Sequence, residues 1–153
     1  MPVMPVRPAA LILALALFLA ACSTQPQEDP MISSDQAKND LVTLFDETAE
    51  TIGGEWTVDT EFEGWDFCNF DRGVDGTAYL ARRSAPPSDD LKAVAELVQA
   101  DWESRGFEVT TRFTADPPLH EVIAHGPYHF SALFGSSAKI MILRGEGACV
   151  KAE

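Results

Sequence analysis

Two stretches of the chain repeat their apolar residues with the period of an amphipathic helix. The first begins at Ser33 and ends at Gly53-Gly54. The second follows residues 86–88 (Pro-Pro-Ser), has Asp89-Asp90 in its expected first turn, and ends at Arg105-Gly106. Serine caps helix starts and glycine adopts the left-handed backbone that ends them, so both stretches are predicted to be helices. Their apolar stripes are Leu41, Leu44, Phe45, Thr48 and Ile52 in the first, and Leu91, Val94, Ala95, Val98 and Trp102 in the second.

Most other segments alternate apolar and polar residues, which is typical of half-buried strands. Residues 56–62 and 65–70, with a bend at Gly64, predict one side of a hairpin, and residues 77–82 predict the other. Four more strands are predicted over residues 107–114, 119–125, 128–134 and 138–144, with turns at 116–118, 126–127 and 135–136. The order α-β-β-α-β-β-β-β predicts an α+β domain, in which two helices pack on one face of an antiparallel sheet.

The first 21 residues differ from the rest of the chain. Arg7 is their only charged side chain, and the run from Ala9 to Ala21 is uncharged. A charged start followed by a short apolar run is typical of a secretory signal peptide, and the run is short for a membrane-spanning helix. Residues 19–22 (Leu-Ala-Ala-Cys) resemble the bacterial lipobox, which implies cleavage before Cys22 and diacylglycerol on its sulfur.

This leader predicts a lipid-anchored protein on the extracytoplasmic face of the cell membrane. Residues 1–21 would be removed, and residues 22–32 would form the lipidated cysteine and a flexible tether, because they are polar and contain two prolines. Residues 33–153 would then form a single α+β domain. Without Arg7 the mature chain has 10 basic and 24 acidic side chains, a formal charge of −14. This charge repels nucleic acid, so nucleic-acid binding is excluded.

Two cysteines remain in the predicted domain, Cys68 and Cys149. An even pair in an exported chain favours a disulfide bond between them, because disulfides persist outside the cytoplasm. A reactive or metal-binding pair is the alternative, although neither cysteine belongs to a C-x-x-C motif.

Several short motifs are spread over the predicted elements: Glu55-Trp56-x-Val58, Cys68, Gly106-Phe107, His120-Glu121-Val122 and the closing segment 145–149 (Gly-Glu-Gly-Ala-Cys). In these residues the domain resembles the LppA-like lipoproteins of mycobacteria. The similarity spans residues 54–149 and departs from the family at the charged segment 144–146, just before the last cysteine. It implies an actinobacterial envelope lipoprotein with an intramolecular disulfide, and it implies no catalytic residues.

No motif in the chain predicts catalysis. Ser136 and Lys139 match S-x-x-K, which in penicillin-binding proteins places serine and lysine one helical turn apart. Here the two residues lie in a predicted turn and strand, where that geometry is lost. The sequence contains neither G-x-S-x-G nor a glycine-rich phosphate loop. We therefore predict a protein that is not an enzyme and has no cofactor.

All three histidines of the chain lie close together in the sequence, at His120, His125 and His129. Neutral imidazoles bind Zn²⁺ or Cu²⁺, so a metal-binding lipoprotein is the alternative function. However, His120 and His125 are an odd number of residues apart, which places them on opposite faces of a regular strand. Ordinary surface or half-buried histidines explain the same pattern.

Aromatic residues crowd the strand around Cys68. Trp65 and Phe67 share one face of it and Phe70 lies on the other. A strand covered on both sides explains this pattern, and so does a groove for a lipid, glycan or peptide on one face. The leading hypothesis is a non-enzymatic module that binds another envelope protein or a small ligand. The residues predicted to make contact are Trp65, Phe67, Tyr128 and Phe130.

Overall fold

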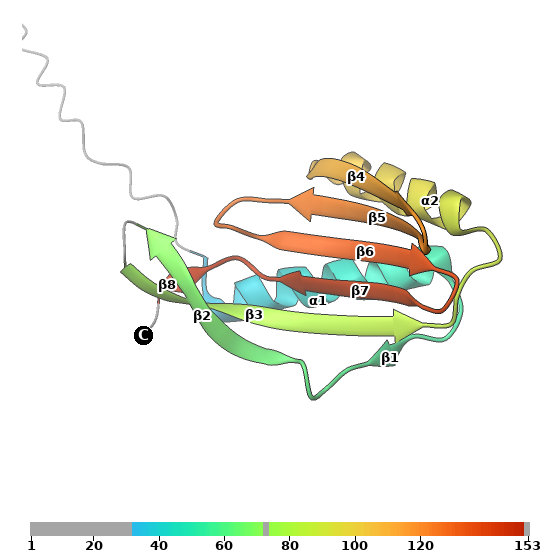
Figure 1. The fold of residues 1–153 in the computed structure, drawn as a ribbon. Coiled ribbons are helices and arrows are strands. Elements are labelled where there is room, and N and C mark those ends of the chain that lie inside the picture. The colour runs from blue at the N-terminus through green and yellow to red at the C-terminus, as the bar shows by residue number, and fades with distance from the viewer. Residues whose placement is uncertain (1–31, 72–73, 152–153) are drawn as a thin grey trace, which may run out of the picture.

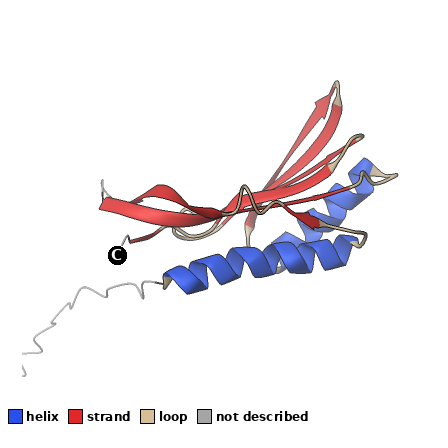
Figure 2. Cartoon of the chain, turned by 90° about the horizontal axis from the view of Figure 1, so that it is seen from below, coloured by secondary structure: helices blue, strands red, loops and turns tan. Residues whose placement is uncertain are grey.

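The computed structural model describes residues 32–71 and 74–151 of the 153-residue chain. Within these ranges the chain forms two helices and an eight-stranded antiparallel sheet (Figure 1). Both helices cover the same face of the sheet, as Figure 2 shows, which confirms the predicted α+β class. The predicted leader, Cys22 and nearly all of the tether lie outside the described residues. The elements are α1 (Ser34–Ile52), β1 (Thr57–Val58), β2 (Gly64–Asp71), β3 (Val74–Ala85), α2 (Leu91–Ser104), β4 (Glu108–Ala115), β5 (Pro118–His125), β6 (Ser131–Ser137), β7 (Met141–Glu146) and β8 (Val150–Lys151).

Local capping chemistry sets the helix ends. The Ser33 hydroxyl accepts a hydrogen bond from the backbone N–H of Gln36 (3.1 Å), and Gly53 ends α1 with φ of 78°. The predicted cap of the second helix is wrong. The N-cap is Asp90, whose carboxylate accepts from the N–H of Ala93 (2.9 Å). The Ser88 hydroxyl instead bonds the N–H of Asp90 (3.2 Å), so it stabilises the turn that precedes the helix.

Strand β3 pairs with four of the other strands. Strands β1 and β2 pair with one of its edges, and β7 and β8 pair with the other. Strands β6, β5 and β4 follow β7 as a continuous antiparallel meander. Among the described residues, no helix is long and apolar enough to cross a membrane.

Some predicted strand boundaries are wrong. Residues 59–63 turn instead of continuing the first strand, because the carbonyl of Asp59 accepts from the N–H groups of Phe62 (3.1 Å) and Glu63 (3.2 Å). The turn expected at 135–136 lies at 137–140, where the hydroxyl of Ser137 donates to the carbonyl of Ile140 (2.9 Å). The expected strand over 128–134 begins only at Ser131, and β8 was not expected.

The core lies between the sheet and the two helices. The helices are joined by a buried hydrogen bond from the Trp102 indole N–H to the Thr48 hydroxyl (2.9 Å), which in turn donates to the carbonyl of Leu44 (2.6 Å). Helix α1 lies close to the sheet at Gly145, where a Cβ would come within 2.6 Å of the Ser131 carbonyl oxygen and 3.0 Å of the Phe45 ring. The largest fully buried side chains include Trp102, Phe45, Phe134, Leu41, Leu143, Val98 and Val122.

Cys68 and Cys149 form a disulfide bond, as predicted. Cys68 pairs with Gly76 of β3, and β8 pairs with the same glycine from the opposite edge, so the bridge crosses β3. Strands on either side of a third strand normally lie about 9–10 Å apart. The two cysteine Cα atoms are only 6.0 Å apart. The segments on either side of β3 therefore come closer together at Gly76, which has no side chain to keep them apart.

Candidate functional site

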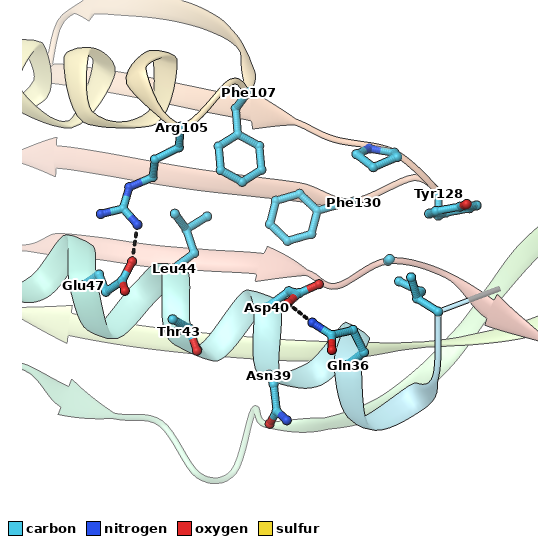
Figure 3. A pocket seen from close by; sticks show the side chains of 13 residues that line it. Gln36, Asn39, Asp40, Thr43, Leu44, Glu47, Arg105, Phe107, Tyr128 and Phe130 are labelled. Carbon is cyan, nitrogen blue, oxygen red and sulfur yellow. Dashed lines mark hydrogen bonds and ion pairs between the residues drawn. The ribbon is translucent and has the colours of Figure 1, made fainter. Parts of the chain in front are cut away.

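Two of the predicted contact residues, Tyr128 and Phe130, line a groove of about 540 Å³. The groove lies between α1, the junction of α2 with β4, and the loop that joins β5 to β6 (Figure 3). This volume falls within the range of about 300–1,000 Å³ that is usual for small-molecule sites.

Apolar side chains form the inner surface of the groove. The rings of Phe107 and Phe130 stack with centroids 5.3 Å apart and planes inclined by 21°. Leu44 extends toward them from α1, and Tyr128 lies beyond Phe130 (Figure 3). Ala148 completes the apolar lining. A surface of this composition gains free energy when it removes another apolar group from water.

Each charged group at the rim of the groove has a hydrogen-bond partner. Arg105 joins the two helices, because its guanidinium bonds Glu47 of α1 and also Asp101 of α2 (Nε to Oδ2, 2.9 Å). The hydrogen bond that the guanidinium donates to Asp101, followed by the one it donates to Glu47, raises the pKa of Arg105 above its ordinary value. Gln36 donates to the carboxylate of Asp40 in the same rim. The groove therefore offers a ligand an apolar surface, together with the polar side chains of Asn39 and Thr43.

The loop that carries Tyr128 is held in a rare conformation. Tyr128 and His129 have φ of 55° and 64°, in the left-handed region that side chains disfavour. Across the loop, the N–H of Gly126 donates to the carbonyl of Phe130 (3.0 Å). The N–H of Cys149 donates to the carbonyl of Tyr128 (2.7 Å). The disulfide-bonded C-terminal segment therefore fixes the side of the groove on which Tyr128 lies. Strain of this kind is often found at binding sites.

The other two predicted contact residues lie outside the groove. Trp65 and Phe67 are on β2, with 45% and 63% of their surfaces exposed. They share the helix-covered face of the sheet, opposite Tyr79 and Thr77 of β3. Burial of Trp65 and Phe67 in the core is therefore excluded. The side chain of Phe70 lies outside the described residues.

The histidines are far from forming one cluster. His120 faces α2 beside Phe113, with ring centroids 4.6 Å apart, in a second hollow of about 550 Å³. His125 lies on the opposite face of β5, as predicted, because the pairing of this strand is unbroken. His129 is exposed in the loop before β6. In the described part of the chain, no three His, Cys, Asp or Glu side chains are placed to hold a metal ion.

A buried ion pair lies on the other side of α1. The side chain of Arg83 is 6% exposed and bonds Glu63, and its Nε lies 3.6 Å from a carboxylate oxygen of Asp46. The hydroxyl of Tyr79 also donates to Glu63 (3.3 Å). These contacts fasten the 59–63 turn to β3 and α1, so they explain the turn rather than form a binding site.

Sequence patterns could not show the groove, because it combines segments that are far apart in the chain. Leu44 was predicted only as a core residue, and Arg105 only as the end of a helix. Phe107 was predicted as the first residue of a strand and, like the segment 145–149, as part of a family resemblance, but neither was predicted to line a groove. Each residue has an ordinary structural role locally, and the fold alone brings Leu44, Arg105, Phe107 and Ala148 together.

Comparison with known proteins supports the fold. No family model matches the chain, and no curated protein matches it. A crystal structure of a DUF4853 family protein from Actinomyces odontolyticus ATCC 17982 is similar, with a TM-score of 0.58 and 19% sequence identity. The match covers 78% of this chain and 67% of that chain. At this identity the likeness concerns the fold and carries no information about activity.

Proposed function

We propose that the chain is a lipid-anchored envelope protein without catalytic activity, whose groove binds an apolar ligand. The ligand is a small molecule or the apolar side chains of another envelope protein. The apolar lining of the groove, in which half-buried Phe107 and Tyr128 lie beside the buried ring of Phe130, is the observation that carries this proposal. The groove is large enough for a drug-sized ligand, and the charged groups at its rim already have hydrogen-bond partners.

The composition of the groove argues for binding rather than catalysis. Its 13 lining residues include no serine, cysteine or histidine. The two acidic side chains on its rim, Asp40 and Glu47, are hydrogen-bonded to Gln36 and Arg105. A general base and an activated nucleophile within reach of each other would be needed for the common hydrolytic mechanisms.

The anchored location is supported by the sequence and by the disulfide. The lipobox-like residues before Cys22 and the resemblance to the LppA-like lipoproteins of mycobacteria both imply export and lipidation. The Cys68–Cys149 bridge is what an oxidising, extracytoplasmic compartment maintains. Replacement of Cys22 by alanine should abolish labelling by an azido fatty acid, and a variant that is still labelled would refute the anchor.

A fluorescence titration with N-phenyl-1-naphthylamine, a neutral apolar probe, tests the groove. We expect saturable binding by the unlipidated mature chain. Tyr128→Ala should weaken it roughly fivefold or more, because an aromatic contact contributes about 0.5–1.5 kcal/mol beyond its buried area. His129→Ala is the matched control, since this residue has the same left-handed backbone but does not line the groove. Equal affinities for the two variants, or no saturable binding, would contradict the proposal.

A further inference from the structure

One aromatic cluster is exposed to solvent close to the start of α1. Trp65 packs edge-on against Tyr79, with ring centroids 5.4 Å apart, and the ammonium group of Lys38 lies 4.8 Å from the centre of the Tyr79 ring. Phe67 follows on the same face of β2 and is 63% exposed. A tryptophan and a phenylalanine exposed side by side cost free energy in water and mark a contact surface.

The cluster and the groove lie on either side of the first turns of α1. Gly147 donates to the carbonyl of Tyr79 (2.8 Å), and two residues later Cys149 donates to the carbonyl of Tyr128 (2.7 Å). The same short segment thus joins the exposed cluster to the rim of the groove. Figure 1 shows the start of α1, the loop between β5 and β6, and β8 toward one end of the molecule.

The lipid anchor would enter at this same end. Ile32, which lines the groove, is only ten residues from Cys22. Ten residues span at most about 35 Å when fully extended. A connection of only ten residues also gives an effective concentration on the order of millimolar. A weak affinity of the nearby surface for the bilayer is therefore enough to keep it in contact.

We propose that this end of the domain rests on the membrane, with Trp65 and Phe67 inserted at the lipid–water interface and the groove opening beside them. This inference rests on the proposed anchor at Cys22. Tryptophan favours the level of the lipid headgroups, where its apolar ring and its polar N–H are both satisfied, and the wholly apolar ring of Phe67 gains free energy by leaving water beside it. A ligand would then pass between the outer leaflet and the groove without crossing the solvent. Because the mature chain carries a formal charge of −14, the contact is made by these rings rather than by attraction to anionic lipid.

The lipidated mature chain in phosphatidylcholine vesicles tests this orientation, with brominated acyl chains as the fluorescence quencher. The chain has three tryptophans. Trp102 is fully buried, and Trp56 donates to the carbonyl of Gly53 beyond the far end of α1. Brominated lipid should quench the wild type and Trp56→Phe, and Trp65→Phe should lose most of that quenching. Trp56→Phe is the matched control, because it removes an indole from the opposite end of the same helix.

Quenching that is the same in Trp65→Phe and wild type would overturn the orientation. Absence of quenching would overturn it as well. If the emission of Trp65 instead shifts to the blue with rising protein concentration and no vesicles, a second copy covers the cluster and the proposal is wrong. Vesicle flotation separates these results from failure of the anchor, because a chain that does not float is not anchored. Binding of N-phenyl-1-naphthylamine by the unlipidated mature chain, measured without vesicles, reports on the groove independently.

Discussion

Loss of the disulfide should destabilise the domain by a large and calculable amount. Cys68 and Cys149 are 81 residues apart in the sequence. Closing a loop of this length in the unfolded chain reduces its entropy by roughly 15 cal/mol/K, which corresponds to about 4.5 kcal/mol at 25 °C. Since domains of this size are stable by about 5–15 kcal/mol, the variant Cys68→Ala/Cys149→Ala should stay folded in the absence of denaturant but lose a large fraction of its free energy of unfolding.

Urea unfolding of the unlipidated mature chain, followed by far-UV circular dichroism, measures this loss. Alanine is the appropriate replacement because Cys149 is 1% exposed, and a serine hydroxyl there would add a penalty of its own. Wild type treated with a phosphine reductant should unfold at nearly the same urea concentration as the double variant. A loss below about 1 kcal/mol would refute the loop-closure argument for this bridge.

The bridge should also affect the groove, because Cys149 holds the loop of Tyr128 through its backbone N–H. In the absence of denaturant, the reduced protein should bind N-phenyl-1-naphthylamine more weakly than the oxidised protein, while its helix content stays the same. Unchanged affinity on reduction would show that the loop keeps its conformation without the bridge.

Two further substitutions test the contacts that hold α1 in place, both by urea unfolding. Thr48→Val should lower the free energy of unfolding by about 1–3 kcal/mol, because it leaves the buried indole N–H of Trp102 without an acceptor. The control is Thr51→Val, since Thr51 is exposed and its hydroxyl makes the same kind of bond to the preceding turn of the helix. This control should change the free energy of unfolding by no more than about 0.5 kcal/mol. Equal losses would contradict this role of the hydroxyl. Glu63→Gln should cost about 1–3 kcal/mol, because it removes the nearest charge from the guanidinium of Arg83 while Asp46 stays 3.6 Å from its Nε; Glu61→Gln, at an exposed residue, is its control. A loss no larger than that of the control would show that the pair contributes little.

The sequence predicted those features of the fold that depend on local chemistry. The start of α1 follows from one hydroxyl at Ser33, and its end from the glycine at position 53. The opposite faces of His120 and His125 follow from the two-residue period of a strand. The disulfide followed from counting the cysteines of a chain that is predicted to be exported.

Other features depend on contacts between distant segments, which periodicity does not encode. Gly135 resembles a turn residue, yet it lies inside β6, where a Cβ would come within 3.1 Å of the Ile142 side chain. The alternation through residues 59–62 resembles a strand, yet the buried pair of Arg83 and Glu63 favours a turn there. The groove was missed for the same reason, although Tyr128 and Phe130 were identified as contact residues.

Two-dimensional ¹H–¹⁵N NMR of the unlipidated mature chain, titrated with N-phenyl-1-naphthylamine, tests the central claim most directly. If the groove is the binding site, the shifts that change should belong to Ile32, Leu44, Phe107, Tyr128 and Ala148, and they should saturate together. Shifts that instead cluster on the uncovered face of the sheet, or that never saturate, would contradict the account.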